Sequence, residues 1–320
     1  MRDDLKKLAK ESKPTRKQMK ERRVAEYVRA EVLPWAGAFE RQRAGDFRMV
    51  IGSDFHGLEV DGFAMATFLD VIKRVKPEVI VLNGDVVDFG AVSSWPKNPN
   101  SRRLLDLEKE LTFTKRQILE PVRAAAPDAQ IDLVVGNHEF RLIRYLADTA
   151  PALASLKCLS IGSLLGLKES RINLVMNDAL LAPDESSQRR QVRQSWKVYG
   201  GCFVVTHGSK AGKFPADKEL ARFGMSGCSG HVHRPQYHST PTLQNPYADW
   251  FCTGMMATNE IPDGEGHGAN FKSGPSSWTV GFAVVSIYQA EGVAIPQQVI
   301  FKNGVAEFAG ITYRRDPPKD

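Results

Sequence analysis

The chain has 320 residues and a net charge of +6, and its 42% hydrophobic and 25% charged residues are the proportions of an ordinary globular protein. Its apolar runs are shorter than the ~20 residues of a membrane-spanning helix, and its charged first thirty residues argue against a secretory signal. Four cysteines without paired spacing are expected to be reduced thiols, which favours a cytoplasmic location.

The positive charge is concentrated at the N-terminus. Residues 1–43 contain 13 Lys and Arg against 7 Asp and Glu, so they carry the whole net charge of +6. We expect a basic helical arm over 1–45, starting near Pro14 and ending near Pro34, and a single domain over 46–320. The arm is interpreted either as an amphipathic helix that packs on the domain or as a segment that contacts nucleic acid, because clustered Lys and Arg are typical of phosphate binding.

The first half of the domain is predicted to alternate strands and helices. Apolar, β-branched runs at 48–53 and 79–83 flank a helical stretch at 62–75, which predicts a βαβ unit with two parallel strands. The elements expected next are a loop at 90–100, a helix at 101–124, a strand at 131–135 and a helical region at 140–166.

The second half is richer in strands. Residues 183–195 include Arg189, Arg190 and Arg193 and show no periodicity, which predicts a basic loop. The remaining expected elements are strands at 202–206, 249–254, 280–288, 295–302 and 305–313, a helix at 215–223 and a glycine-rich loop at 263–275. This pattern alone indicates one α/β domain.

Polar motifs follow five of the short apolar runs, at the point where each run ends. They are Asp54-x-His56, Gly84-Asp85-x-x-Asp88, Gly136-Asn137-His138-Glu139, Thr206-His207-Gly208 and Gly230-His231-x-His233. Five of the seven histidines lie in these motifs. In α/β architectures ligands collect at the carboxyl ends of the strands. Oxygen and imidazole ligands without thiolate favour Mn, Fe, Zn or Ni over a structural zinc ion.

The five motifs, in this order and over residues 50–234, resemble those of the calcineurin-like metallophosphoesterase superfamily. The stretches 140–166 and 183–195 resemble those of phosphoesterases of bacteria and their viruses. The resemblance implies an α/β fold, a four-layer αββα sandwich of two mixed β-sheets flanked by helices. It also implies a hydrolase of phosphoester bonds with two divalent transition-metal ions, manganese being our first expectation.

The resemblance also implies a set of metal ligands. One ion would be held by Asp54, His56 and His233. The other would be held by Asn137, His207 and His231, and Asp85 would bridge the two. A shared carboxylate suits two cations that lie close together, because one anion screens their repulsion.

Four further residues are expected to take part in catalysis or in substrate binding. By the resemblance, His138 would contact the substrate and protonate the leaving oxygen, with Asp88 orienting its imidazole. Arg141 and Arg144 follow the same motif and are predicted to contact the substrate phosphate.

The substrate class is inferred from positions at which this chain differs from branches of the superfamily, and from the placement of its basic residues. Protein phosphatases of the superfamily carry arginines where this chain has Phe89 and Val135, which argues against a phosphoprotein substrate. Many diesterases of the superfamily have aspartate where this chain has Glu139, which weakens the match to that branch. The basic arm and the loop arginines nevertheless favour a phosphodiesterase or nuclease. The alternatives are a phosphomonoesterase on nucleotides or small molecules and a non-catalytic protein on the same fold.

Overall fold

The computed structural model describes residues 44–93, 106–176, 195–243, 245–258 and 278–316, together with Met19 and Arg23. Met19 and Arg23 are helical and exposed. The rest of the predicted arm, residues 183–194 of the basic loop and the glycine-rich loop at 263–275 lie outside the described residues.

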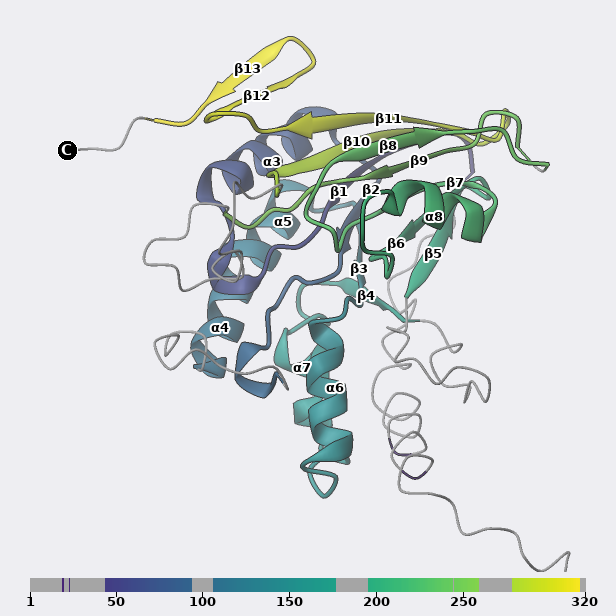
Figure 1. Ribbon diagram of the computed structural model, residues 1–320. Coiled ribbons are helices and arrows are strands. Elements are labelled where there is room, and N and C mark those ends of the chain that lie inside the picture. Colours follow the sequence, from purple (N-terminus) through teal and green to yellow (C-terminus); the bar gives the residue numbers. More distant parts are fainter. Residues whose placement is uncertain are drawn as a thin grey trace, which may run out of the picture.

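The first β-sheet has six strands in the order β11-β10-β1-β2-β3-β4 (Figure 1). The strands are β1 (Phe47–Gly52), β2 (Val79–Asn83), β3 (Gln130–Val134), β4 (Ile172–Val175), β10 (Gly281–Tyr288) and β11 (Val293–Ile300). Strands β1 to β4 are parallel, whereas β10 and β11 are antiparallel to their neighbours, so the sheet is mixed. The predicted βαβ unit at its centre is confirmed.

The second β-sheet has five strands in the order β5-β6-β7-β9-β8. The strands are β5 (Trp196–Tyr199), β6 (Phe203–Thr206), β7 (Ser226–Ser229), β8 (Gln236–Ser239) and β9 (Asp249–Cys252). Strands β6, β7 and β9 are parallel, and the two edge strands are antiparallel to them.

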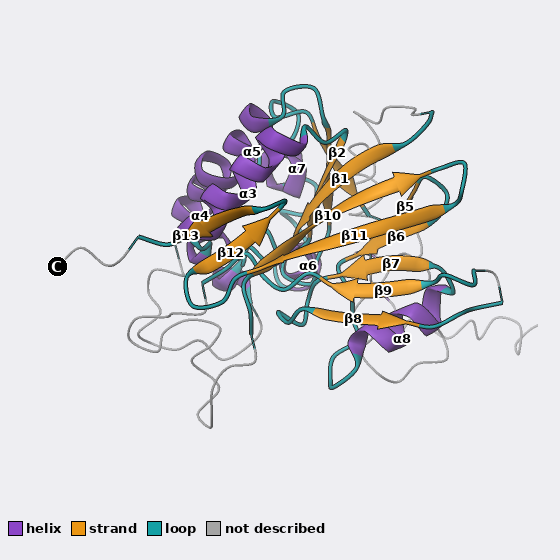
Figure 2. Cartoon of the chain, turned by 90° about the horizontal axis from the view of Figure 1, so that it is seen from above, coloured by secondary structure: helices purple, strands orange, loops and turns teal. Residues whose placement is uncertain are grey.

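Helices cover the outer faces of both sheets. The described helices are α3 (Gly62–Val75), α4 (Leu107–Thr114), the π-helical turn η6 (Lys115–Leu119), α5 (Glu120–Ala125), α6 (Glu139–Asp148), α7 (Ile161–Leu164) and α8 (Pro215–Phe223), with short 3-10 turns η3 (Gly57–Glu59), η4 (Gly90–Val92) and η7 (Lys157–Leu159). Figure 2 shows α3, α4 and α5 on one side of the sheets and α8 on the other.

Alternation along the strands builds the layers. In β1, Met49 and Ile51 belong to an apolar cluster that also contains Phe203 and Phe251 of the second sheet, so this cluster lies between the sheets. Val50 points the other way, into the cluster formed with α3 to α7. A third, smaller cluster joins the second sheet to α8. The predicted four-layer arrangement of two mixed sheets with outer helices is confirmed.

The end of the chain differs from the prediction. The single strand expected at 305–313 is a hairpin of β12 (Val305–Phe308) and β13 (Ile311–Arg314). Ala309 and Gly310 connect the two strands, with φ angles of 51° and 78°. Alanine gives little signal for such a left-handed turn, so the apolar pattern ran through it. Tyr313 of the hairpin donates a hydrogen bond to Asp70 of α3 at 2.8 Å.

Among the described helices, none is both long and apolar enough to cross a membrane.

Candidate metal centre

The motif residues meet at one edge of the sandwich, to which both sheets contribute. Asp54 and Asp85 follow the parallel strands β1 and β2 of the first sheet, while His207 and His231 follow β6 and β7 of the second. The Asn83 side chain at the end of β2 donates to the Thr206 carbonyl at 2.9 Å, which ties the two sheets together beside the motifs.

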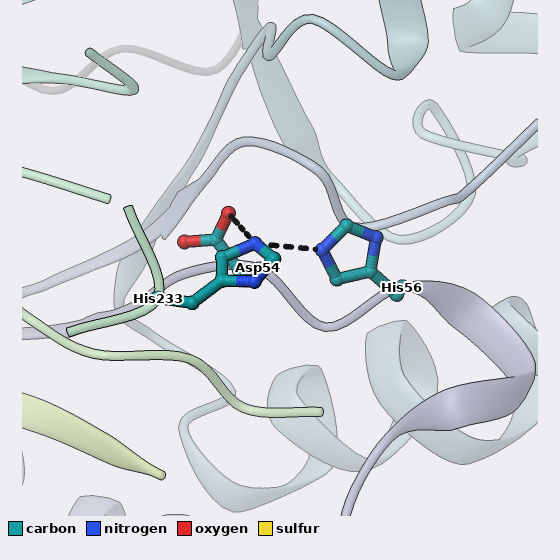
Figure 3. Close-up of side chains that lie close together, drawn as sticks. All are labelled: Asp54, His56 and His233. Carbon is teal, nitrogen blue, oxygen red and sulfur yellow. Dashed lines mark hydrogen bonds and ion pairs between the residues drawn. The ribbon is translucent and has the colours of Figure 1, made fainter. Parts of the chain in front are cut away.

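One group of ligand atoms comes from Asp54, His56 and His233 (Figure 3). His233 Nε2 lies 3.2 Å from Asp54 Oδ1 and 3.2 Å from His56 Nε2. All three side chains are buried. These are the residues predicted to hold one metal ion, and their carboxylate and imidazole atoms converge on one point.

A second group comes from Asp85, His207 and His231. His207 Nε2 lies 3.1 Å from Asp85 Oδ2 and 3.1 Å from the side-chain oxygen of Asn137. That oxygen is also 2.8 Å from His231 Nδ1. The structure therefore brings together the four residues predicted to surround the other ion, including the bridging Asp85.

The two groups adjoin each other. His207 Nε2 is 3.9 Å from Asp54 Oδ1 of the first group. His56 and Asp85 also share a third cluster of ligand atoms with His138. All seven residues predicted to bind metal thus lie in a single pair of neighbouring donor sets.

The ring orientations suit metal binding. His207 Nδ1 lies 2.8 Å from the Asn83 carbonyl, so it carries a proton and donates there. In the neutral ring, Nε2 would present a lone pair towards Asp85 Oδ2 and the Asn137 oxygen, which are themselves acceptors. These three atoms need a positive charge among them, which a proton on Nε2 supplies and which a divalent ion in its place would supply, so the donor set fits such an ion.

The electrostatics of the centre show the same need for positive charge. Burial by itself would lower the pKa of His207, but attraction to Asp85 and Asp54 outweighs burial and raises that pKa to about 10. Burial by itself would raise the pKa of Asp54, yet His233 and His207 bring it down to about 2. Burial, and then the charge on His207, lower the pKa of His231 to about 4. The carboxylates are thus held as anions among imidazoles.

Backbone strain is concentrated at the centre. Five of the predicted ligands have positive φ angles, a region that non-glycine residues rarely adopt: Asp54 (57°), His56 (52°), Asp85 (51°), His231 (67°) and His233 (55°). Such conformations cost of order 1–3 kcal/mol each and gather where function requires a fixed geometry.

Two glycines let the loops after β2 and β3 pack tightly against each other and against the ligand side chains. A Cβ on Gly84 would collide with the His207 ring and would lie 2.9 Å from Gly136 Cα. A Cβ on Gly136 would collide with the Asp85 carboxylate and would lie 2.6 Å from the Asp85 backbone nitrogen. The glycine before each of these ligand motifs is therefore required by packing.

Glu139 is a functional residue whose importance the sequence did not show. Its side chain is fully buried and accepts backbone hydrogen bonds from Asp85 and Gly136 at 2.9 Å, from Val86 at 2.7 Å and from Val87 at 3.2 Å. One carboxylate thus binds the loop after β2 to the loop after β3. Its only sequence signal was its place directly after the Asn-His pair.

Asp88 supports two histidines at once. Its Oδ1 lies 2.7 Å from His138 Nδ1 and 3.2 Å from His56 Nδ1. Burial would lower the pKa of His138, but Asp85 and Asp88 raise it. The predicted orientation of His138 by Asp88 agrees with this geometry, while the catalytic roles of both residues stay predictions.

The two arginines predicted to contact phosphate are placed differently. Arg141 donates to the Asp88 carbonyl at 2.8 Å and to Asp88 Oδ2 at 3.2 Å, and its Nη2 lies 2.8 Å from His138 Nε2. It therefore lies at the edge of the metal centre. Arg144 is exposed, and its guanidinium is 5.6 Å from the centroid of the Phe140 ring. Phosphate contact by either residue stays a prediction.

Three known proteins are similar to parts of this chain. The gene 54 protein of Mycobacterium phage L5 is 25% identical over 251 residues, which cover 75% of this chain and 89% of that protein. Among solved structures, a phosphoesterase from E. coli named Yfce is 14% identical, with a TM-score of 0.31, and the match covers 79% of this chain and 98% of that one. A dimetal phosphatase from Danio rerio is 12% identical, with a TM-score of 0.36, covering 85% and 99%.

The family comparison is more direct. The sequence profile described as calcineurin-like phosphoesterase matches residues 47–235, which is more than half of the chain. The matched region begins at β1 and ends just after His233, so it contains all five motifs and every residue of both donor sets. The chain belongs to the calcineurin-like phosphoesterase family.

Proposed function

We propose that the chain is a phosphodiesterase that works with two divalent transition-metal ions, manganese first among them. The observation that carries the proposal is the convergence of seven donors into two adjoining sets, with Asp85 in one set and also clustered with His56 of the other. When bound, such a pair of ions supplies a hydroxide at neutral pH and offsets the charge on the phosphoryl oxygens.

The chain's own residues would contact the substrate and donate a proton to the leaving oxygen. His138 is buried and its ring shares a cluster of ligand atoms with His56 and Asp85, so in the proposal it adjoins an ester bound at the centre. Asp88 fixes the ring through Nδ1, and Nε2 then faces the centre, 3.6 Å from Asp85 Oδ2. Burial would lower the pKa of His138, but Asp85 and Asp88 raise it, which favours a protonated ring that can donate to the leaving oxygen.

Preference for a diester is supported by the uncharged residues at the two positions where protein phosphatases of the superfamily carry arginines. Phe89 is fully buried and Val135 is 3% exposed, so neither position offers a charge to a phosphate. Arg141 is engaged by Asp88. A monoester carries one more ionised oxygen than a diester, and it needs more cationic contacts than these positions provide.

The test is to measure metal content and ester preference on the same preparation. Protein loaded with Mn²⁺ should contain two ions per chain by elemental analysis and should hydrolyse bis(p-nitrophenyl) phosphate faster than p-nitrophenyl phosphate. Asp85→Asn should lose both ions, because the shared anion is removed. Faster hydrolysis of the monoester would support the phosphomonoesterase alternative, in which Arg141 turns to the phosphate. Two bound ions without turnover of either ester would support the non-catalytic alternative.

A further inference from the structure

The loop between His207 and α8 carries an unusual set of side chains. Residues 208–214, Gly-Ser-Lys-Ala-Gly-Lys-Phe, include two lysines and a phenylalanine and no acidic residue. We refer to this segment as the rim loop. Lys210 and Lys213 are exposed, and Phe214 is 58% exposed. A large aromatic side chain so open to water does not serve the core of the protein.

The rim loop is held in place at both ends. Glu219 of α8 is buried, and its Oε1 accepts backbone hydrogen bonds from Ser209 at 3.0 Å and Lys210 at 3.2 Å. The Arg234 side chain donates to the Gly212 carbonyl, and the Gln236 side chain donates to the Lys213 carbonyl at 2.8 Å. The backbone is therefore ordered before any ligand arrives, which lowers the entropic cost of binding.

The rim loop begins beside the metal centre. A Cβ on Gly208 would lie 3.6 Å from the Cβ of the ligand His231, and Arg234 directly follows the ligand His233. Lys210 is three residues from His207, so its Cα lies within about 10 Å of that ligand's Cα. The first residues of the rim loop therefore border the metal centre, and groups next to a phosphate bound there would have the loop within reach.

A third lysine adds to the charge. The Nζ of Lys218, on α8, would lie 3.7 Å from a Cβ on Gly212. The Lys213 ammonium is 5.2 Å from the centroid of the Phe214 ring. Asp217, the acidic residue in the first turn of α8, is 3.3 Å from His238. The surface thus combines three cationic side chains with one exposed aromatic ring.

We propose that the rim loop binds the single-stranded nucleic acid that flanks the scissile phosphate, with a base stacked on Phe214 and phosphates at Lys210, Lys213 and Lys218. An aromatic platform beside a basic track is how proteins bind single strands without reading their sequence. Three lysines exceed what one phosphate needs, which favours a strand over a mononucleotide. This inference rests on the proposed function, because it names the substrate of the same centre.

The first test measures binding of a fluorescein-labelled 12-nucleotide oligothymidylate with phosphorothioate linkages, by anisotropy, to the full-length Mn²⁺-loaded protein. Phe214→Ala should weaken binding by about tenfold or more, whereas Phe214→Trp should preserve it. Lys210→Ala combined with Lys213→Ala should reduce the slope of log K against log salt by about 1.4, since each phosphate contact on a single strand contributes ~0.7.

Matched controls lie at the opposite end of the sandwich. Tyr288, 38% exposed at the end of β10, and Lys73, exposed in the last turn of α3, are far along their elements from the motifs. Tyr288→Ala and Lys73→Ala should bind the oligothymidylate as the unchanged protein does. Equal losses in control and rim-loop variants would overturn the inference, as would unchanged affinity and salt slope in the rim-loop variants.

Competition separates a strand from a small nucleotide. Unlabelled oligothymidylate should displace the probe at far lower concentration than thymidine 5′-monophosphate. Equal displacement per phosphate would overturn the inference that the rim loop binds a strand. Turnover of bis(p-nitrophenyl) phosphate by the unchanged protein tests the proposed function separately. If the unchanged protein hydrolyses the ester and the rim-loop variants bind oligothymidylate as well as it does, only the rim-loop inference is refuted. If the rim-loop variants lose binding and the unchanged protein does not hydrolyse the ester, only the catalytic proposal is refuted.

Discussion

At the scale of single residues, His138 separates metal binding from proton transfer. His138→Gln keeps a hydrogen-bonding side chain but removes the titratable proton, and general acid catalysis is typically worth about 10²–10⁴-fold. We expect both metal ions to remain and kcat to fall, most strongly for alkoxide leaving groups that need protonation. Elemental analysis and rates on esters of graded leaving-group pKa measure this.

The comparison for His138 is the ligand His207. His207→Gln removes a nitrogen that lies 3.1 Å from Asp85, so it should lower metal content as well as rate. If His138→Gln lost metal too, or slowed good and poor leaving groups equally, the acid role would be refuted.

Glu110 predicts a pH dependence of stability. Its Oε1 accepts from the Asp88 and Phe89 amides at 2.6 and 3.0 Å, and its buried Oε2 has no hydrogen-bond partner among the described residues. Burial, followed by repulsion from Asp88, raises its pKa from 4.5 to about 8. The folded protein therefore keeps a proton that the unfolded chain releases near pH 4.5, and stability falls as pH rises from 4.5 to 8.

Glu110→Gln tests this dependence. The amide keeps the oxygen acceptor and cannot ionise, so the variant should gain stability relative to the unchanged protein as pH rises, by at most about 5 kcal/mol. Urea denaturation of metal-free protein at pH 5 and pH 8 measures the difference. Glu108→Gln, on the exposed face of the same helix, should show no such trend. Parallel stability curves for both variants would show that Glu110 is ionised throughout.

At the scale of elements, Glu139 determines how the loops after β2 and β3 fit together. In Glu139→Gln, one end of the side chain must present an NH₂ group to backbone N–H donors, whichever way the amide is turned. We expect a loss of about 1–3 kcal/mol of stability together with weaker metal binding. Thermal unfolding and metal titration check this, with Glu120→Gln, at the exposed first residue of α5, as the control. An unchanged midpoint and affinity would show that the loops hold their shape without this carboxylate.

Elements with local signals could be predicted from the sequence, and those that depend on tertiary contacts could not. The predicted bounds of α3 match the structure because Asp61 caps its first turn, accepting from the Ala64 amide at 2.9 Å, and Lys76 ends it in a left-handed conformation. The predicted bounds of β2 also match, because its apolar run ends at Asn83-Gly84. Strands β4, β5 and β8 are four residues each and lie at the edges of their sheets, so their sequence patterns were too short to reveal them.

The features of the candidate centre likewise divide into those that the sequence could predict and those that depend on tertiary contacts. Its donors could be identified because they recur in motifs at strand ends, and the structure brings them together. The positive φ angles of Asp54 and His56 are imposed by the junction of two loops, where Asp54 and His56 donate to the Gly84 and Asp85 carbonyls at 3.0 and 2.9 Å. Glu110 reaches the site from a helix 22 residues beyond Asp88, and nothing near it in the sequence indicates that contact.

At the scale of the whole molecule, charge distribution predicts a role for the N-terminal arm. Deleting residues 1–43 removes the whole net charge of +6, so binding to DNA or RNA should weaken and its salt dependence should flatten. Activity on a small chromogenic ester should survive the deletion. Nucleic-acid affinity at several salt concentrations measures the effect. Unchanged affinity, or loss of folding, would favour a helix that packs on the domain.

The ligands are divided between the two sheets, and this division has a thermodynamic consequence. Asp54, Asp85 and Asn137 extend from the first sheet, whereas His207, His231 and His233 extend from the second. Ions held by ligands from both sheets would link the two sheets of the folded protein. Each ion would stabilise the fold by RT ln(1 + [M]/Kd), about 4 kcal/mol at a thousandfold excess over Kd. The temperature at which the sheets separate would then report the concentration of free metal around the protein.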